Sequence, residues 1–171
     1  AICLFEADFN WWNKLIFARR MMHLAGDKGQ IPEESYAKKN SHAMNAIMAK
    51  RFFGDISKSQ HWPSAISGCD FANAYNRAAH PPISVALQAW GIPPKAVRVL
   101  LMALQTMQFF LRTGFGESKE SYGGTLENPN FGLGQGNGAA PPGFSARSAL
   151  VINAYKRMGN GAKLTSAYTA R

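Results

Sequence analysis

The sequence predicts an α+β fold, in which helices and a few strands follow one another without regular alternation. Apolar residues recur at helical spacing in several stretches of the 171-residue chain. Runs of small, β-branched and aromatic residues between these stretches are typical of short strands. A chain of this length with 46% hydrophobic residues can bury one core, so we expect a single domain or part of one.

Two helices are predicted in the first third of the chain. Asp8 is the expected N-cap of the first, whose apolar residues follow one face as far as Ala25 and which Gly26 would end. The second is expected to begin at Pro32, because a proline and the two acidic residues after it suit a first helical turn. Its apolar pattern ends at Gly54.

A short buried strand is predicted over residues 64–71, which include small and β-branched side chains. Two helices are expected to follow, each opened by a pair of prolines. The first starts at residues 81–82 and is stopped by Gly91. The second starts at residues 93–94 and carries apolar residues at helical spacing to Leu104.

The last third of the chain is expected to contain both kinds of element. Residues 109–115 and 121–126 are predicted to form two strands about a turn at residues 116–119. A glycine-rich loop follows. A final helix is predicted over residues 144–158, with Gly159 as its stop.

The formal net charge of +9 at pH 7 favours an anionic partner, and nucleic acid is the commonest such partner. No acidic residue follows Glu127, whereas basic residues continue to the end of the sequence. A solvated basic face accounts for the same composition. Charge alone therefore leaves both interpretations open.

Cys3 and Cys69 are too few for a disulfide framework or a metal cage. A reducing compartment fits this usage, so we expect an intracellular protein of the nucleus or cytoplasm. The apolar start is too short for a signal sequence, and the other apolar stretches are interrupted before membrane-spanning length. We therefore expect a soluble chain without a membrane partner.

The glycine-rich loop of residues 132–141 places Gln135 among small residues. Residues 134–139 match the G-x-G-x-x-A dinucleotide fingerprint, but that motif must open a helix directly behind a strand. Asn128-Pro129 precedes the loop and Pro141-Pro142 follows it, so we expect the required frame to be missing. A surface loop without function remains an alternative.

Residues 70–80 and the glycine-rich loop together resemble motifs A and B of reverse transcriptases. In that family the first catalytic aspartate stands at a strand end, and an aromatic residue follows five positions later. A glutamine-glycine loop ending in proline comes after a helical insertion. In this chain the same places are occupied, in the same order, by Asp70, Tyr75, Gln135-Gly136 and Pro141.

The resemblance extends beyond these two motifs. Arg77 and His80 match the end of motif A, and residues 112–118 match an Arg-Thr-x-x-Gly-x-Ser segment of retroelement enzymes. Residues 31–36 look like part of the fingers of the same group. Asn76 departs from the pattern, because the family often has aspartate there.

The resemblance implies a partial right-hand polymerase fold, with helical fingers in residues 1–62 and an incomplete palm sheet in residues 63–171. Motif C, an aromatic-x-Asp-Asp hairpin, should follow motif B. No two aspartates adjoin in the sequence, and none follows Asp70. We therefore expect a fragment that stops before motif C and is inactive by itself.

The function implied by the resemblance is that of a retrotransposon RNA-directed DNA polymerase, which extends a DNA primer on an RNA template with deoxynucleoside triphosphates. Two-metal nucleotidyl transfer needs carboxylates that hold Mg²⁺, with Mn²⁺ as an alternative. The resemblance makes Asp70 the catalytic metal ligand, with the backbone carbonyl of Phe71 beside it. The ring of Tyr75 would lie under the sugar and exclude a 2′-hydroxyl.

The resemblance also implies that Gln135 and Gly136 contact a templating or incoming base from their loop. Cationic side chains neutralise phosphates whatever the base sequence. Arg112 is one candidate for this role. The others, which are candidates for the triphosphate or the template, are Lys14, Arg19, Arg20, Lys38 and Lys39.

Less specific interpretations stay open for the same residues. Each cation is also explained as a solvated surface charge, Asp70 as an ordinary cap and Tyr75 as a packing residue. For the whole chain the alternatives are a non-catalytic nucleic-acid-binding module derived from the polymerase fold and a small-molecule-binding domain around the glycine-rich loop. Primer extension and salt-dependent RNA binding distinguish the three functions.

Overall fold

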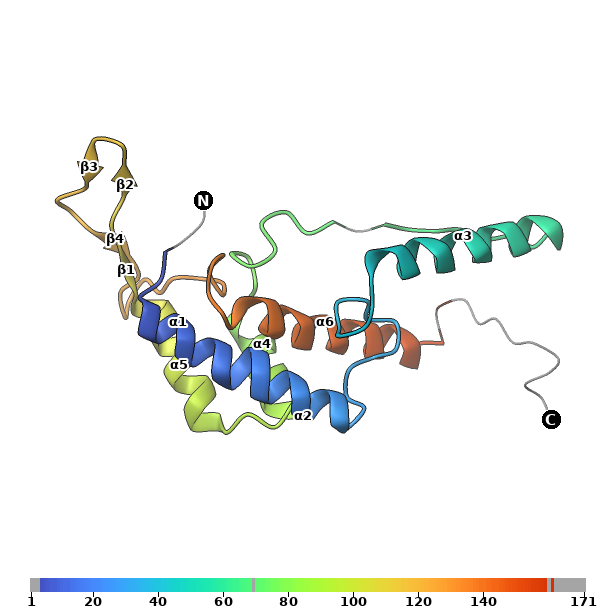
Figure 1. Ribbon diagram of the computed structural model, residues 1–171, viewed down its shortest axis with the longest axis horizontal. Coiled ribbons are helices and arrows are strands. Elements are labelled where there is room, and N and C mark those ends of the chain that lie inside the picture. Colours follow the sequence, from blue (N-terminus) through green and yellow to red (C-terminus); the bar gives the residue numbers. More distant parts are fainter. Residues whose placement is uncertain (1–3, 69, 160, 162–171) are drawn as a thin grey trace. The chain divides into compact units, whose positions relative to one another are not determined.

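The structure is a computed structural model that describes residues 4–68, 70–159 and 161 (Figure 1). Cys3 and Cys69 lie outside the described residues. Helices form most of the regular structure. Each described strand has two residues, and the strands form two antiparallel pairs. The prediction of a mixed α+β chain is therefore confirmed in this coarse form.

The chain divides into two compact units. The first combines the N-terminal segment to Gln30 with residues 71–148. The second combines residues 31–70 with the segment from Ala149 onward. The expected division into fingers and palm follows other boundaries and stays a prediction.

The first unit begins with one continuous helical segment: α1 (Ala7–Asn13), η1 (Lys14–Met21) and α2 (Met22–Asp27). Its N-cap is Glu6, so Asp8 lies in the first turn and does not cap the helix as predicted. The helix also passes Gly26, which was expected to end it. Gly29 supplies the left-handed conformation, with φ of 62°, and its N–H donates to the carbonyl oxygen of Gly26.

A buried stripe runs along this helical segment at intervals of four residues, formed by Asn13, Phe17, Met21 and Ala25. The middle part, η1, is a π-helix. In a π-helix the backbone hydrogen bond joins residues five apart. Such stretches are rare in proteins, and those that occur often lie at functional sites.

Two helices, α4 (His80–Ala89) and α5 (Pro94–Thr106), pack against each other in the same unit. Both start near their predicted proline pairs, and Gly91 follows α4 with φ of 87°. The contact buries apolar residues such as Ile83, Leu87 and Leu100. The predictions for these two helices are confirmed.

The strands form one antiparallel arm. β1 (Gln108–Phe109) pairs with β4 (Tyr122–Gly123), and β2 (Arg112–Thr113) pairs with β3 (Gly116–Glu117). The turn lies at residues 114–115 and not at 116–119 as predicted. The Thr113 hydroxyl accepts from the backbone N–H of Phe115, which closes the turn earlier.

The helix α6 (Ala140–Arg157) is divided between the two units. Its residues up to Ser148 belong to the first unit, and those from Ala149 belong to the second. It begins four residues before the predicted start, because prolines are tolerated in a first helical turn. The expectation that Pro141-Pro142 would keep a helix from opening directly behind the glycine-rich loop is therefore wrong. The predicted lack of the complete strand-turn-helix frame is nevertheless confirmed, because residues 124–131, which precede the loop, contain no strand. Gly159 follows the helix with φ of 77°, as predicted.

The second unit contains α3 (Ala43–Ser59). The helix predicted to begin at Pro32 starts eleven residues later, at Ala43. Asn40 adopts a left-handed conformation with φ of 63°, which a right-handed helix cannot contain. The helix also continues through Gly54 and ends at Ser59. A glycine inside a helix costs stability but does not end it.

The strand predicted over residues 64–71 is not formed in the described part of that segment. The described residues there are all exposed and pair with no other strand that the structure describes. A strand gains stability from a hydrogen-bonded neighbour, and composition does not reveal whether one is present. In the part of the chain that the structure describes, Asp70 therefore precedes a series of turns and ends no strand.

Candidate functional site

The glycine-rich loop is attached to the N-terminal helix by side-chain amides. The backbone N–H of Gly138 donates to Asn10 Oδ1 at 2.6 Å, and Asn10 Nδ2 donates to the Gly136 carbonyl oxygen at 3.3 Å. One turn further along the helix, Asn13 Nδ2 donates to Asn137 Oδ1 at 2.8 Å. The loop therefore has a defined position on α1.

Asn137 also closes the loop on itself. Its Oδ1 accepts a second hydrogen bond, from the backbone N–H of Ala139 at 3.0 Å, and its Nδ2 donates to the Leu133 carbonyl oxygen at 3.0 Å. The side chain is buried. The resemblance to motif B points to Gln135 and not to Asn137, although asparagine side chains commonly bond nearby backbone groups in turns.

Two glycines in the loop allow close approach of neighbouring chain. Gly132 has φ of 84°, and a methyl group added there would collide with the backbone of Asn76. A methyl group at Gly138 would lie 2.9 Å from the Asn10 carbonyl oxygen and closer still to Lys14. Glycine is needed at both places for contact, and at Gly132 for conformation as well.

The segment that resembles motif A lies against this loop. The backbone N–H of Leu133 donates to the Tyr75 carbonyl oxygen at 2.7 Å. The backbone N–H of Gln135 donates to Asn76 Oδ1 at 3.3 Å. Residues about 60 positions apart in the sequence are thus joined directly. The role of the Asn76 side chain is to accept one of these hydrogen bonds with its amide oxygen.

His80 supports the loop from α4. Its Nε2 lies 2.8 Å from the Gly132 carbonyl oxygen, and Gln105 Nε2 lies 3.0 Å from its Nδ1. Because the amide nitrogen of Gln105 only donates, Nδ1 is the acceptor and Nε2 carries the proton that Gly132 accepts. The buried imidazole thereby links α5 to the start of the loop.

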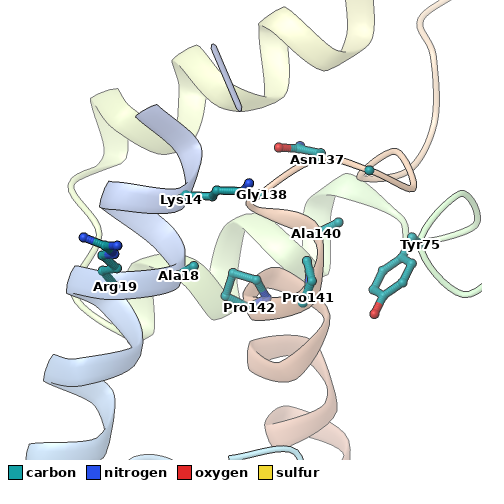
Figure 2. A pocket seen from close by; sticks show the side chains of 10 residues that line it. Lys14, Ala18, Arg19, Tyr75, Asn137, Gly138, Ala140, Pro141 and Pro142 are labelled. Atoms are coloured by element: carbon teal, nitrogen blue, oxygen red, sulfur yellow. The ribbon is translucent and has the colours of Figure 1, made fainter. Parts of the chain in front are cut away.

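A pocket of about 510 Å³ opens between η1, the loop and the start of α6. Figure 2 shows Lys14 extending from η1 toward Gly138, while Tyr75 lies on the other side of the pocket. Among the described lining residues the charged ones are basic. The lining consists of Lys14, Ala18, Arg19, Tyr75, Gly136, Asn137, Gly138, Ala140, Pro141 and Pro142.

The two cations that line the pocket, Lys14 and Arg19, both come from η1, together with Ala18. Both cationic side chains are exposed to solvent and free to meet an anion.

The structure brings together part of the predicted site. Tyr75, Gly136 and Arg19 line one pocket, together with Lys14. Gln135 is exposed beside them and is not a lining residue. Arg20 is exposed on η1 but is not part of the lining, and Arg112 is exposed on β2.

The other predicted residues are not part of the pocket lining. Lys39 and Asp70 belong to the second unit and are exposed. Lys38, in the same unit, donates from Nζ to the carbonyl oxygens of Pro32 at 3.3 Å and Glu33 at 3.1 Å. Phe71 begins the segment of residues 71–148 that belongs to the first unit, and about half of its surface is exposed.

The residues that the structure describes contain no group of three or more histidine, cysteine, aspartate or glutamate side chains that could hold a metal ion. Two-metal transfer needs several carboxylates, whereas the resemblance gives this chain only Asp70. Magnesium binding stays a prediction. In the described part of the chain, no helix has the length and apolar character needed to cross a membrane.

Comparison with protein-family models, curated proteins and solved structures finds no match for this chain. Its function is therefore inferred from the residues of the site.

Proposed function

We propose that this chain supplies the nucleotide-binding pocket of an RNA-directed DNA polymerase of the retrotransposon type. One observation carries the proposal: Tyr75 and Gly136, from the segments that resemble motifs A and B, line the same pocket with two cations. The pocket volume lies within the range of about 300–1,000 Å³ that is usual for small-ligand sites.

Each part of the lining suits one part of a deoxynucleoside triphosphate. Lys14 and Arg19 neutralise the phosphates, because exposed cationic side chains attract phosphate groups electrostatically and form charge-assisted hydrogen bonds with them. The ring of Tyr75 supports the sugar and excludes a 2′-hydroxyl. Gly136 has φ of 110° and no side chain, so the backbone there leaves space for a base.

The remaining parts of the enzyme belong to the same proposal. RNA template and DNA primer are the expected partners, and the exposed arginines Arg20 and Arg112 suit contact with their phosphates. Asp70 supplies one of the carboxylates for Mg²⁺ in the complete polymerase. Further carboxylates are needed for transfer, so the chain by itself binds nucleotide without joining it to a primer.

A non-catalytic nucleic-acid-binding module is the second candidate. It is favoured by the exposed arginines Arg20 and Arg112, which suit contact with phosphates without any catalytic chemistry. Both functions require phosphate binding at the basic residues. A deoxynucleotide preference is expected only for the polymerase.

A calorimetric titration of the 171-residue chain with dGTP tests the proposal by measuring the dissociation constant. Lys14→Gln should weaken dGTP binding about tenfold, because a hydrogen bond to a charged group is lost. Lys119→Gln is the matched control, since it removes an exposed lysine from the β arm, outside the pocket. Absence of dGTP binding, or equal loss in both variants, would contradict the proposal.

A further inference from the structure

Three aromatic rings lie together beside the pocket. The ring of Phe144, on α6, meets the ring of Tyr75 at a centroid distance of 5.7 Å and an interplanar angle of 75°. It meets the ring of Phe71 at 5.8 Å and 81°. Both contacts have the edge-to-face geometry that aromatic pairs prefer.

Arg147, on the next turn of α6, contacts two of the three rings. Its guanidinium carbon lies 5.7 Å from the centroid of the Phe71 ring and 5.9 Å from that of Phe144. Residues three apart share one face of a helix, so Phe144 and Arg147 project to the same side. A guanidinium at this distance from an aromatic face is attracted to the ring.

Regular secondary structure does not orient Tyr75. Residues 72–77 form turns, and Asn73 has φ of 52°. The hydrogen bond from Leu133 to the Tyr75 carbonyl oxygen fixes the backbone but not the ring. Among the described aromatic contacts, the contact with Phe144 is the one that Tyr75 makes.

We propose that Phe144 is a specificity-determining residue of the pocket, acting through Tyr75. This inference rests on the proposed function, because it assumes that the Tyr75 ring meets the sugar of a nucleotide. The ring of Phe144 supports the Tyr75 ring from α6 and keeps it in the pocket lining. A smaller side chain at position 144 lets the ring withdraw, which creates space for a 2′-hydroxyl.

The test compares dGTP and GTP, which differ at the 2′ position, in titrations of the 171-residue chain. Phe144→Leu should lower the preference for dGTP about threefold to tenfold, the range expected for the loss of one aromatic pair. Phe144→Tyr keeps the ring and should preserve the preference. Phe110→Leu, the same substitution at an exposed position of the β arm, is the matched control.

A second measurement follows the Tyr75 ring protons by NMR without nucleotide. Their ring-current shifts should change in Phe144→Leu and remain in Phe110→Leu. If the shifts change but the wild-type chain binds neither nucleotide, the proposed function fails and the inference fails with it. If the wild-type chain prefers dGTP and Phe144→Leu keeps that preference, the inference alone is overturned.

Discussion

Asn13 and Asn137 share a buried side-chain hydrogen bond of 2.8 Å, although 124 positions separate them in the sequence. The bond joins the last residue of α1 to the middle of the glycine-rich loop. It therefore fixes the distance between the two walls of the pocket, η1 on one side and the loop on the other.

Asn137→Ala should lower the free energy of unfolding by about 2–3 kcal/mol, because it leaves buried donors and acceptors without partners. The groups affected are Asn13 Nδ2, the Ala139 N–H and the Leu133 carbonyl oxygen. Urea unfolding measures the loss. Asn45→Ala, at an exposed position of α3, should change stability little, and equal losses would argue against the amide network.

Gly132→Ala should destabilise the chain by about 2 kcal/mol or more, since it adds a collision with Asn76 to a strained left-handed backbone. Gly54→Ala is the matched control. Its added methyl group meets no atom within 4 Å, and it replaces a glycine inside α3. It should raise stability by about 0.5–1 kcal/mol. Thermal unfolding of both variants gives the comparison, and a harmless Gly132→Ala would contradict the loop geometry.

Tyr75→Val should abolish most of the preference for dGTP over GTP, because the branched side chain is too short to reach the sugar. The measurement is the ratio of the two dissociation constants. Tyr75→Phe, which retains the ring, should keep the ratio near that of the wild type. An unchanged ratio in Tyr75→Val would make Tyr75 a packing residue.

The pair formed by Lys156 and Glu34 should make the stability of the second unit depend on pH. Lys156 Nζ lies 2.7 Å from Glu34 Oε1, and the hydrogen bond from this ammonium lowers the pKa of Glu34 below its ordinary value of 4.5. The contribution is therefore present above that pH and is lost as the pH falls through the lowered pKa. Its size is about 0.2–1 kcal/mol, because both side chains are half-exposed.

Urea unfolding of the wild type and Lys156→Met at pH 7 and at pH 3 measures this effect. The difference in stability between the two proteins should be present at pH 7 and shrink at pH 3. Lys58→Met removes another exposed lysine of the second unit and should show no such trend. A difference that grows on acidification would refute the assignment.

The 171-residue chain should bind RNA with an affinity that falls as salt rises, because association releases counterions from the phosphates. It should not extend a primer with Mg²⁺ or Mn²⁺, since Asp70 lacks the other carboxylates of the catalytic set. A salt titration and a primer-extension assay test the two parts. Extension by the purified chain, or binding insensitive to salt, would each remove one part of the expectation.

Local signals were reliable where neighbouring residues decide the structure. Pro93-Pro94 fixes the backbone for a first helical turn, and Gly91 and Gly159 adopt the positive φ that ends a helix. Similar signals misled where a different residue nearby took the same role. Gly26 lies inside α2 because Gly29 makes the left-handed turn three residues later.

The pocket was predicted in part. The resemblance selected Tyr75 and Gly136, which do line one cavity, and the charge of the chain selected Lys14 and Arg19. Nothing local indicated that residues 14–21 form a π-helix. Asn10, Asn13 and Phe144 were missed because their roles depend on partners distant in the sequence.

The sequence by itself determined the α+β class, most of the helices and the residue types that suit a phosphate-bearing ligand. These follow from side-chain periodicity, proline and glycine conformation and net charge, which are properties of short segments. The tertiary structure decided that Tyr75 and the glycine-rich loop meet, and that residues 64–68 pair with no strand in the described part of the chain. Hydrogen bonds and ring contacts between distant segments form only when the chain folds, so their partners cannot be read from either segment alone.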